Sequence, residues 1–305
     1  MFKEIYKNKR VLVTGHTGFK GSWLTTWLLN LGAEVAGYSI SVPTVPAHFE
    51  ELKIENKIKH YLGDIRDYEY FYKVCQEFKP EFIFHLAAQP LVRDSYENPR
   101  ETFDVNMIGT LNVMEVIRQM KDTVKVGVII TSDKCYDNVE WVYGYREDDK
   151  LGGEDPYSGS KGAAELVVKS YMHSFFKQGF PNVCTTRAGN VIGGGDWAKD
   201  RIVPDIVRSW SNNNAVEIRS PYSTRPWQHV LEPLSAYLIL AEKLWQDPSL
   251  ADAYNFGPPA DQAASVREVI TLAQQAYGQG QVRFADLLAV PDSPVLSACR
   301  IVPIP

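Results

Sequence analysis

Apolar and polar positions alternate along the first 190 or so residues in a pattern that predicts parallel strands and helices. Short apolar runs predict strands at residues 10–14, 34–38, 59–62, 81–85, 125–131 and 183–187. Longer stretches with apolar residues three and four positions apart predict helices at residues 21–31, 67–78, 99–119 and 157–178. Apolar strands that alternate with helices indicate an α/β fold, a doubly wound parallel sheet covered on both faces. Ligands of such sheets bind beyond the carboxyl ends of the strands.

After about residue 187 the pattern becomes irregular and rich in glycine, proline, tryptophan and arginine. The sequence has no internal repeat and no low-complexity linker. We therefore expect two interleaved parts. The first is a sheet-forming domain over residues 1–182, and the second is a smaller C-terminal lobe over residues 183–305.

Composition narrows the class of protein. The chain has 305 residues with 45% hydrophobic content, enough to bury one large core or two joined cores. A net charge of −5 and a pI of about 5.7 argue against a nucleic-acid partner. Four scattered cysteines, at positions 75, 135, 184 and 299, fit neither a zinc site nor a disulfide framework and indicate a reducing compartment. We find no secretory signal and no apolar run that spans a bilayer, so we expect a cytoplasmic protein with no membrane partner and no metal.

Three glycines, Gly15, Gly18 and Gly21, lie between the first predicted strand and the first predicted helix. Glycines at these positions allow a sharp turn, a close approach of pyrophosphate to the backbone, and tight packing of the helix on the strand. The helix N-terminus then offers free N–H groups to the phosphates. Glycines also serve ordinary turns, but the strand before and the helix after favour a dinucleotide site. The remaining loop residues are His16, Thr17, Phe19 and Lys20.

A tyrosine and a lysine, Tyr157 and Lys161, lie four residues apart at the start of the last predicted helix. This spacing places them on one helix face, roughly 6 Å apart at the backbone. A nearby ammonium favours the phenolate and lowers the pKa of the phenol, which suits a base that takes a proton from a sugar hydroxyl. The alternative is an incidental pair at a helix start.

Three polar side chains, Ser132, Asp133 and Lys134, follow the predicted strand at residues 125–131. Polar groups at the end of a buried strand are costly unless they face a cleft. Strand-end solvation or a helix cap is the alternative. We expect the three residues to converge with Tyr157 at the ligand edge of the sheet.

With these motifs together, the chain resembles the extended short-chain dehydrogenase/reductases and, among them, the CDP-glucose 4,6-dehydratase branch. The glycine spacing G-x-x-G-x-x-G is typical of this superfamily, and the resemblance runs from about residue 9 to about residue 290. It is also carried by residues 63–67, 85–90, 106, 187–197, 225–230 and 254–258. The resemblance implies a Rossmann fold, bound NAD, and a nucleotide sugar, CDP-glucose, as substrate.

The family's reaction is a closed redox cycle. By resemblance, Tyr157 deprotonates the hydroxyl on sugar carbon 4 while a hydride moves to NAD, and Lys161 supports it. The proton on carbon 5 and the hydroxyl on carbon 6 then leave as water, and the hydride returns to carbon 6. Ser132 would hold the carbon 4 hydroxyl, and Asp133 would protonate the leaving hydroxyl. In this chain, Lys134 occupies the position at which the family has the base for carbon 5. Lys134 is either that base or a structural, salt-bridging lysine.

The resemblance also implies the binding residues. Cofactor contacts are expected from the whole glycine loop, from Tyr157 and Lys161, and from Asp64, Ile65, Ala87, Ala88 and Gln89. Arg225 is expected at the nucleotide-phosphate end of the substrate and Asn190 at its pyrophosphate. Arg201 and Arg208 are expected to flank a turn at residues 203–205 that borders the base. Arg187 is expected to be structural.

Two features of the cofactor site depart from the family pattern. No Asp or Glu ends the second strand, where residues 36–41 contain only small, aromatic, aliphatic and hydroxyl side chains. The usual acidic partner of the NAD ribose is therefore missing, and no arginine there favours NADP. His16 and Lys20 occupy positions that are small or apolar in relatives. Lys20 either pairs with the pyrophosphate or is solvated.

The last residues, 292–305, have neither helical periodicity nor the family pattern. We therefore expect a substrate lobe that is altered or truncated after about residue 291. The helices predicted at 99–119 and 157–178 are long and apolar-periodic, and in extended relatives such helices pair across a two-fold axis. A homodimer is therefore expected.

Three functions remain open on the sequence. The leading one is a CDP-glucose 4,6-dehydratase of deoxysugar synthesis for lipopolysaccharide. The second is a nucleotide-sugar epimerase, which needs the tyrosine redox step but no acid at position 133. The third is a non-catalytic dinucleotide-binding protein, in keeping with the unusual tail.

Overall fold

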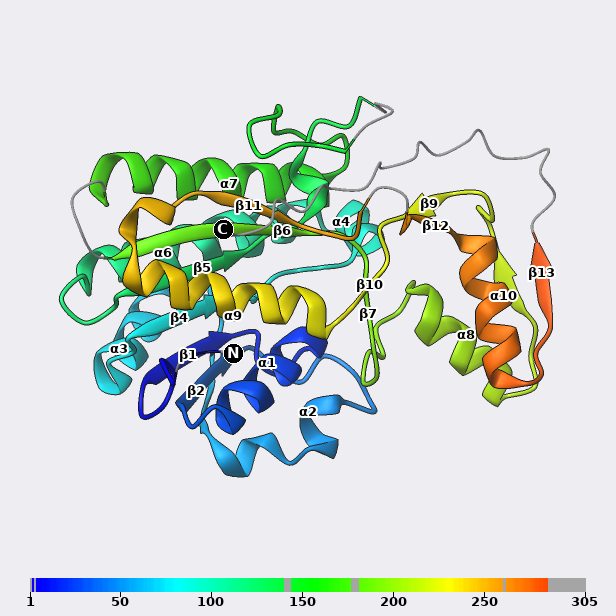
Figure 1. The fold of residues 1–305 in the computed structure, drawn as a ribbon, viewed down its shortest axis with the longest axis horizontal. Coiled ribbons are helices and arrows are strands. Elements are labelled where there is room, and N and C mark those ends of the chain that lie inside the picture. The colour runs from blue at the N-terminus through cyan, green and yellow to red at the C-terminus, as the bar shows by residue number, and fades with distance from the viewer. Residues whose placement is uncertain (1, 3, 140–143, 177–180, 260–261, 285–305) are drawn as a thin grey trace.

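The computed structural model describes residues 2, 4–139, 144–176, 181–259 and 262–284. A sheet lies between two layers of helices, and a small lobe projects from this main body (Figure 1). Within the described ranges the sheet has seven strands in the order β11-β6-β5-β4-β1-β2-β3. Every neighbouring pair in that order is parallel. The predicted doubly wound parallel sheet is confirmed.

The six predicted strands are present nearly at their predicted bounds. They are β1 (Arg10–Thr14), β2 (Glu34–Ser39), β3 (Lys59–Leu62), β4 (Phe82–His85), β5 (Val126–Ile130) and β6 (Asn182–Ala188). Three predicted helices are α1 (Phe19–Asn30), α3 (Tyr68–Phe78) and α7 (Pro156–Phe175). The fourth consists of α5 (Pro99–Phe103), one π-helical turn (Asp104–Ile108) and α6 (Gly109–Gln119). The predicted helix end at residues 177–178 lies outside the described residues.

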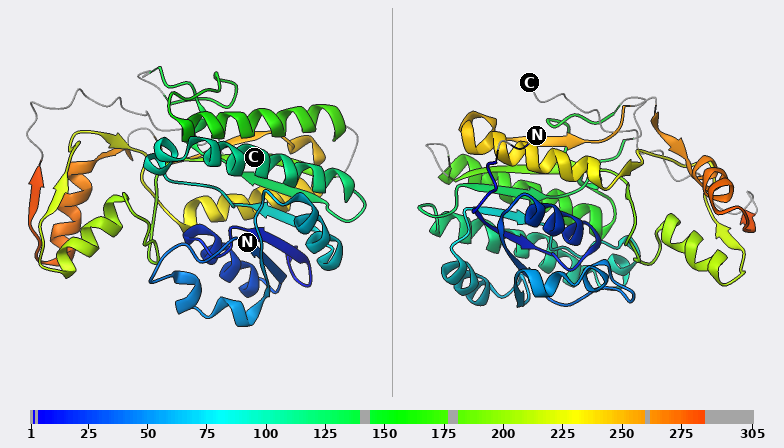
Figure 2. Two further views of the ribbon diagram at one scale, coloured as in Figure 1. Left: turned by 180° about the vertical axis from the view of Figure 1, so that it is seen from behind. Right: turned by 60° about the horizontal axis from the view of Figure 1, so that its bottom comes forward.

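Helices bury both faces of the sheet (Figures 1 and 2). On one face, α1 and α9 (Leu231–Gln246) bring Leu28 and Leu238 into an apolar cluster with the alternate side chains of the strands. On the other face, α3, α6 and α7 contribute Phe71, Ile117 and Val168 to a second cluster. Because both faces are buried, the strands read as continuous apolar runs, which is why the sequence identified them.

Past β6, where the sequence pattern is irregular, the structure still contains helices and strands. Helix α9 and strand β11 (Ala253–Phe256) belong to the main body, where β11 pairs with β6 at the sheet edge. The projecting lobe contains α8 (Ile202–Ser211), β8 (Val216–Ile218), α10 (Val266–Tyr277) and β13 (Val282–Phe284). Helix α9 was missed because it is apolar on most sides, which hides the 3.6-residue period.

Short paired segments connect the lobe to the main body. Strand β7 (Val191–Ile192) pairs with β10 (Gln228–His229), and β9 (Thr224–Arg225) pairs with β12 (Ala264–Ser265). The lobe has its own small core of Ile206, Trp210, Val216, Ile218 and Ile270. The sheet takes β6 and β11 from the second predicted part of the chain. The boundary at residue 182 stays a prediction, and the tail at 292–305 lies outside the described residues.

The strand order reverses beside β1, which lies between β2 and β4. At such a reversal the connections leave in opposite directions and open a crevice beyond the carboxyl ends of the strands. The topology therefore places a ligand site next to the glycine loop that follows β1.

Candidate active site

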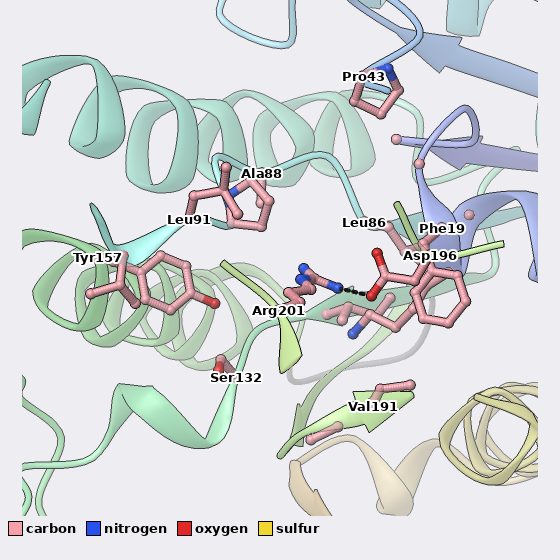
Figure 3. Close-up of a pocket in the computed structure, with 18 of the residues that line it drawn as sticks. Phe19, Pro43, Leu86, Ala88, Leu91, Ser132, Tyr157, Val191, Asp196 and Arg201 are labelled. Atoms are coloured by element: carbon pink, nitrogen blue, oxygen red, sulfur yellow. Dashed lines mark hydrogen bonds and ion pairs between the residues drawn. The ribbon is translucent and has the colours of Figure 1, made fainter. Parts of the chain in front are cut away.

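A cavity of about 680 Å³ occupies this crevice. Its walls come from the glycine loop, from the segments after β2, β3, β4 and β5, from α7, and from the lobe. Figure 3 shows Tyr157 and Ser132 on one side of it and Phe19 and Asp196 on the other, with Arg201 between them. A cavity of this size and mixed lining suits a small organic ligand or a cofactor.

The glycine loop forms one end of this cavity. Gly15 has a φ of +70°, and a Cβ there would lie 2.7 Å from the Ala87 nitrogen. A Cβ at Gly21 would lie 2.1 Å from the Gly15 oxygen, so only glycine fits either position. Gly18 is the N-cap of α1, whose first turn carries no acidic residue. Free N–H groups and the positive end of the helix dipole therefore face the cavity, which fits a pyrophosphate.

The loop's other residues divide between the cavity and the interior. Thr17, Phe19 and Lys20 line the cavity, as expected. His16 does not line it, because its ring is fully buried beneath the loop. Its Nδ1 lies 2.8 Å from the Ser39 Oγ and its Nε2 lies 2.7 Å from the His60 Nδ1. His16 is therefore placed to shape the loop from below rather than to touch a ligand.

The expected adenine contacts, Asp64 and Ile65, line the cavity beyond β3. Asp64 accepts hydrogen bonds from the Arg66 guanidinium, which lowers the pKa of the carboxyl group. Ser39 stands at the end of β2, where relatives are expected to have an acid, and it also lines the cavity.

After β4, two of the three expected residues line the cavity. Ala87 and Ala88 are in its wall, but Gln89 is not. The Gln89 side chain donates to the Leu91 oxygen at 3.0 Å and to the Thr102 Oγ1 at 2.9 Å. Its amide is thus engaged in holding the following loop, which explains its place outside the cavity.

The opposite end of the cavity contains Ser132, Asp133 and Tyr157, as the sequence predicts. The Tyr157 hydroxyl points toward Ser132 in Figure 3. The Ser132 hydroxyl donates to the Asp133 Oδ1 at 3.0 Å. Each of the three is less than a tenth exposed. An acid, a hydroxyl and a phenol are thus brought together from the end of β5 and from α7.

The pKa values at this end differ from the simple expectation. Burial raises the pKa of Tyr157 to about 12, against a lowering by the hydrogen bond with Ser132. The groups that lower the phenol pKa are Ser132 and Arg201 rather than the expected Lys161, and desolvation of the phenolate outweighs them. Burial also lowers the pKa of Lys161 to about 8. Near neutral pH the phenol is therefore protonated, and most Lys161 amines still carry their charge.

Two more cations face the same space. Burial lowers the pKa of Lys134, with Asp133 acting in the opposite direction. Burial lowers the pKa of Lys20 to about 8, and the charges of Arg201 and Lys161 add to that effect. A lysine with a lowered pKa can act as a base, so the geometry leaves that role open to Lys134.

A third wall comes from the lobe and from the segments that connect it to the main body. Arg201, Arg225 and Asn190 line the cavity, and Arg201 donates to the Asp196 carboxylate at 2.9 Å (Figure 3). The expected turn at 203–205 is wrong, because these residues form the first turn of α8. A proline is compatible with a first helical turn, so Pro204 was a misleading signal.

Arg208 does not line the cavity. Its guanidinium pairs with Asp205 one turn earlier and donates to the Trp197 oxygen at 2.8 Å. Two arginines that the sequence analysis missed do line it, Arg93 from α4 (Val92–Glu97) and Arg219 after β8. Both pair with Asp200. Nothing in their local sequence marks them, since neither follows a recognisable motif.

Within the described ranges, no group of three or more His, Cys, Asp or Glu side chains is arranged to hold a metal ion. Among the same residues, no helix is both long and apolar enough to cross a membrane.

The family model described as GDP-mannose 4,6 dehydratase matches residues 12–281. The chain is 52% identical over 282 residues to a CDP-glucose 4,6-dehydratase of Salmonella typhimurium, covering 90% of this chain and 78% of the relative. It is 25% identical over 305 residues to a CDP-paratose 2-epimerase of Salmonella typhi, covering 91% and 87% of the two chains.

Solved structures share the fold. The UDP-glucose 4-epimerase of Thermus thermophilus in complex with NAD superposes with a TM-score of 0.78 at 26% identity, over 90% of this chain and 85% of that one. The dTDP-glucose 4,6-dehydratase of Bacillus anthracis in complex with NAD gives a TM-score of 0.75 at 20% identity, over 91% and 84%.

Proposed function

Because this chain belongs to the GDP-mannose 4,6-dehydratase family of extended short-chain dehydrogenase/reductases, we propose that it converts CDP-glucose to CDP-4-keto-6-deoxyglucose and water. The observation that carries this proposal is the 52% identity to a CDP-glucose 4,6-dehydratase over 90% of the chain. The side chains that this reaction needs converge on one cavity, which supports it further.

NAD is the proposed cofactor. The glycine cradle and the free N-terminus of α1 fit its pyrophosphate, and an NAD complex is among the similar structures at 26% identity. Gly15, Thr17, Gly18, Phe19, Lys20 and Gly21 would hold it, with Asp64, Ile65, Ala87 and Ala88. When bound, NAD supplies a site that takes up a hydride from sugar carbon 4 and returns it to carbon 6.

The side chains at the far end of the cavity would move the protons. Tyr157 takes the proton of the carbon 4 hydroxyl, which Ser132 holds in place. The accepting species is the phenolate of Tyr157, because the neutral phenol has no site for that proton. A positive charge beside the phenol favours the phenolate, and Lys161 supplies that charge when protonated. Asp133 donates a proton to the carbon 6 hydroxyl as it leaves.

Lys134 is the proposed base for carbon 5. Its pKa is lowered by burial, and a neutral amine can accept the carbon 5 proton once the neighbouring ketone has made that proton acidic. The alternative role as a salt-bridging lysine rests on Asp133, whose charge raises the pKa of Lys134.

The substrate's diphosphate would lie between the lobe and the main body. Arg225 and Arg201 offer planar guanidinium groups that match phosphate oxygens, and Asn190 offers an amide beside them. Arg208 is not part of this proposal, because it lies outside the cavity.

We infer a cytoplasmic homodimer that makes deoxysugar precursors for lipopolysaccharide. Helices α6 and α7 lie side by side, as do the helices that pair across a two-fold axis in extended relatives. Sedimentation that shows only monomer at micromolar concentration would contradict the homodimer.

The reaction is tested by incubating the purified chain and added NAD with CDP-glucose, and in parallel with UDP-, dTDP- and GDP-linked sugars. Mass spectrometry of the products is the readout. Loss of one water from CDP-glucose supports the dehydratase. An unchanged mass with a new sugar identifies an epimerase, and no product from any sugar favours a non-catalytic dinucleotide-binding protein.

A further inference from the structure

A buried carboxylate lies on α7 outside the set of residues assigned to the reaction. Glu165 follows Lys161 by one helical turn and Tyr157 by two, so all three lie on one face of α7. Its side chain is 2% exposed. A carboxylate this deeply buried costs several kcal/mol unless charges and hydrogen bonds compensate it, roughly as for other buried ions.

Three donors compensate the Glu165 carboxylate. The Arg187 Nη2 donates to the Glu165 Oε2 at 2.8 Å, and the Thr185 Oγ1 donates to the same oxygen at 2.8 Å. The Thr131 hydroxyl donates to the Glu165 Oε1. These donors come from β6 and from the residue that follows β5. One carboxylate therefore joins the helix that carries Tyr157 to two central strands.

Thr131 directly precedes Ser132, so its bond to Glu165 fixes the start of the catalytic segment. Its backbone nitrogen also donates to the Thr186 oxygen at 2.9 Å. At this point the strand ends and the chain turns into the short 3₁₀ helix η3 (Asp133–Cys135). A shift of Thr131 would therefore carry Ser132 and Asp133 with it.

Arg187 holds the other end of the same segment. Its Nη1 donates to the Tyr136 hydroxyl at 2.7 Å, and its guanidinium lies 5.0 Å from the centre of the Tyr136 ring. Tyr136 ends the run that begins at Thr131. The ion pair of Glu165 and Arg187 thus holds residues 131–136 at both ends, and Ser132, Asp133 and Lys134 lie between these two points.

The pair also places charge near the reacting groups. The charge of Glu165 raises the pKa of Lys161 against the larger lowering by burial. The titratable groups that face Glu165 are Arg187 and Cys184 from β6 and Lys161 from its own helix. Lys161 is further influenced by Cys135, and it acts in turn on His85 from β4 and Lys20 from α1.

We propose that Glu165 and Arg187 are positioning residues, which hold the segment that carries Ser132, Asp133 and Lys134 in register with Tyr157 and Lys161 on α7. This inference rests on the proposed function for the identity of the reaction. It assigns to the pair a task beyond stability, namely the alignment of hydroxyl, acid and phenol.

The first test compares Glu165→Gln with the wild type, with Glu81→Gln as the matched control. Glu81 also joins an ion pair, with Lys9 at 2.9 Å, but at the amino ends of the strands. NADH formation is followed in a single turnover with CDP-glucose, and the dissociation constants of NAD and CDP-glucose are measured separately. Glu165→Gln is expected to slow hydride transfer at least about tenfold with little change in either constant, and Glu81→Gln to change neither, since a small misalignment has a large effect on rate.

The pH profile of hydride transfer separates positioning from simple stability. Without the Glu165 charge, Lys161 loses its proton more readily, so the alkaline limb of the profile is expected to move to lower pH by about one unit. An unmoved limb, together with a normal rate in a folded Glu165→Gln protein, overturns the proposal.

Two further variants test the proposal if the Glu165→Gln protein does not fold. Thr131→Val removes one of the two holding contacts and leaves the ion pair intact, and it is expected to lose rate about tenfold without losing substrate affinity. The double variant Glu165→Gln/Arg187→Met removes both charges, and uncharged replacements of buried pairs often keep a fold. If the double variant recovers the wild-type rate along with stability, the pair is only structural and the proposal fails.

A crystal structure of the Thr131→Val or double variant provides a readout that needs no turnover. The proposal expects the Ser132 hydroxyl to move relative to the Tyr157 hydroxyl by more than about 0.5 Å. Unchanged positions in both variants refute it. Failure of the proposed reaction gives a different result, because the wild type would then form no product from CDP-glucose while this displacement is still measured.

Discussion

The two ends of the active-site cavity handle their polar groups in opposite ways. At the end near β2 and β3, polar side chains are bonded to one another: Asp64 to Arg66, and Ser39 to His16. At the end near β5 and α7, burial shifts the pKa values of Tyr157 and Lys161. In the first arrangement, the pKa values of Asp64 and His16 are both lowered, so neither group changes its charge near neutral pH, which suits holding a cofactor. The second gives groups with displaced protonation equilibria, which suits moving protons.

The largest effect is expected from removal of the Tyr157 hydroxyl. Tyr157→Phe is expected to lower the turnover number by about 10⁴-fold, the upper end of general acid–base effects, since the first proton transfer is lost. NAD affinity is expected to change little, because the phenol is not its main anchor. Steady-state kinetics and calorimetric NAD titration are the measurements, with Tyr254→Phe outside the cavity as control. Substantial remaining turnover would remove Tyr157 from its proposed role.

A second variant separates oxidation from water loss at the same end. Asp133→Asn is expected to leave oxidation at carbon 4 intact and to slow dehydration about 10²-fold, because an amide does not deliver the proton. NADH absorbance should therefore rise and persist in a single turnover. Asp205→Asn on α8 is the control. A silent trace with both ligands shown to be bound would contradict the role of Asp133.

The buried histidines give a test of stability rather than of rate. Burial lowers the pKa values of His16 and His85 to about 3, with His60 adding to the effect on His16 and Lys161 to that on His85. Below about pH 6.5 the unfolded chain therefore binds protons that the folded chain does not, and folding stability falls.

The expected loss is up to about 1.4 kcal/mol per pH unit for each histidine, from about pH 6.5 down to the folded-state values. Urea unfolding at several values in the acid range measures this slope. A His85→Gln variant should show a shallower slope than the wild type. An equal slope in both proteins would mean that His85 takes up its proton without unfolding.

The smallest expected effect concerns the carboxyl end of β2, where Ser39 stands in place of the expected acid. A charge-assisted hydrogen bond to the NAD ribose contributes about 1.5–3 kcal/mol, so its absence predicts weak NAD binding and easy loss on dialysis. Ser39→Asp is expected to tighten NAD binding about tenfold, with Ser211→Asp on the lobe as control. Protein that keeps stoichiometric NAD after dialysis, with an unchanged affinity in Ser39→Asp, would show that other contacts such as Lys20 compensate.

The sheet was predictable from sequence for a physical reason. Strands buried on both faces are apolar throughout and end in glycine or polar residues, so β1 and β5 reveal both their position and their ligand edge. Strand β11 was not predicted, because it contains Asn255, whose amide is satisfied by distant partners that local sequence does not reveal.

At the active site, too, local sequence did not reveal side chains whose position depends on residues far away in the chain. Ser132, Asp133 and Tyr157 were found because each lies at a fixed offset from a strand or helix end. Arg219 was missed and Arg208 misplaced because their directions depend on how the lobe folds back over the cavity. Side chains positioned by tertiary contacts alone, such as Glu165, leave no local signature.

The place of β11 at the sheet edge has a consequence for folding of the chain during its synthesis on the ribosome. The Tyr136 hydroxyl, at the end of the catalytic segment, donates to Asn255 of β11 at 2.7 Å. Synthesis adds roughly 5–20 residues per second, so residue 136 waits many seconds before residue 255 exists. During that time the sheet has its glycine loop and first strands, but it lacks its last edge strand. The unpaired edge can then pair with other chains that are being made on the same messenger RNA. The order of synthesis thus leaves β6 as an exposed edge until β11 is made and pairs with it.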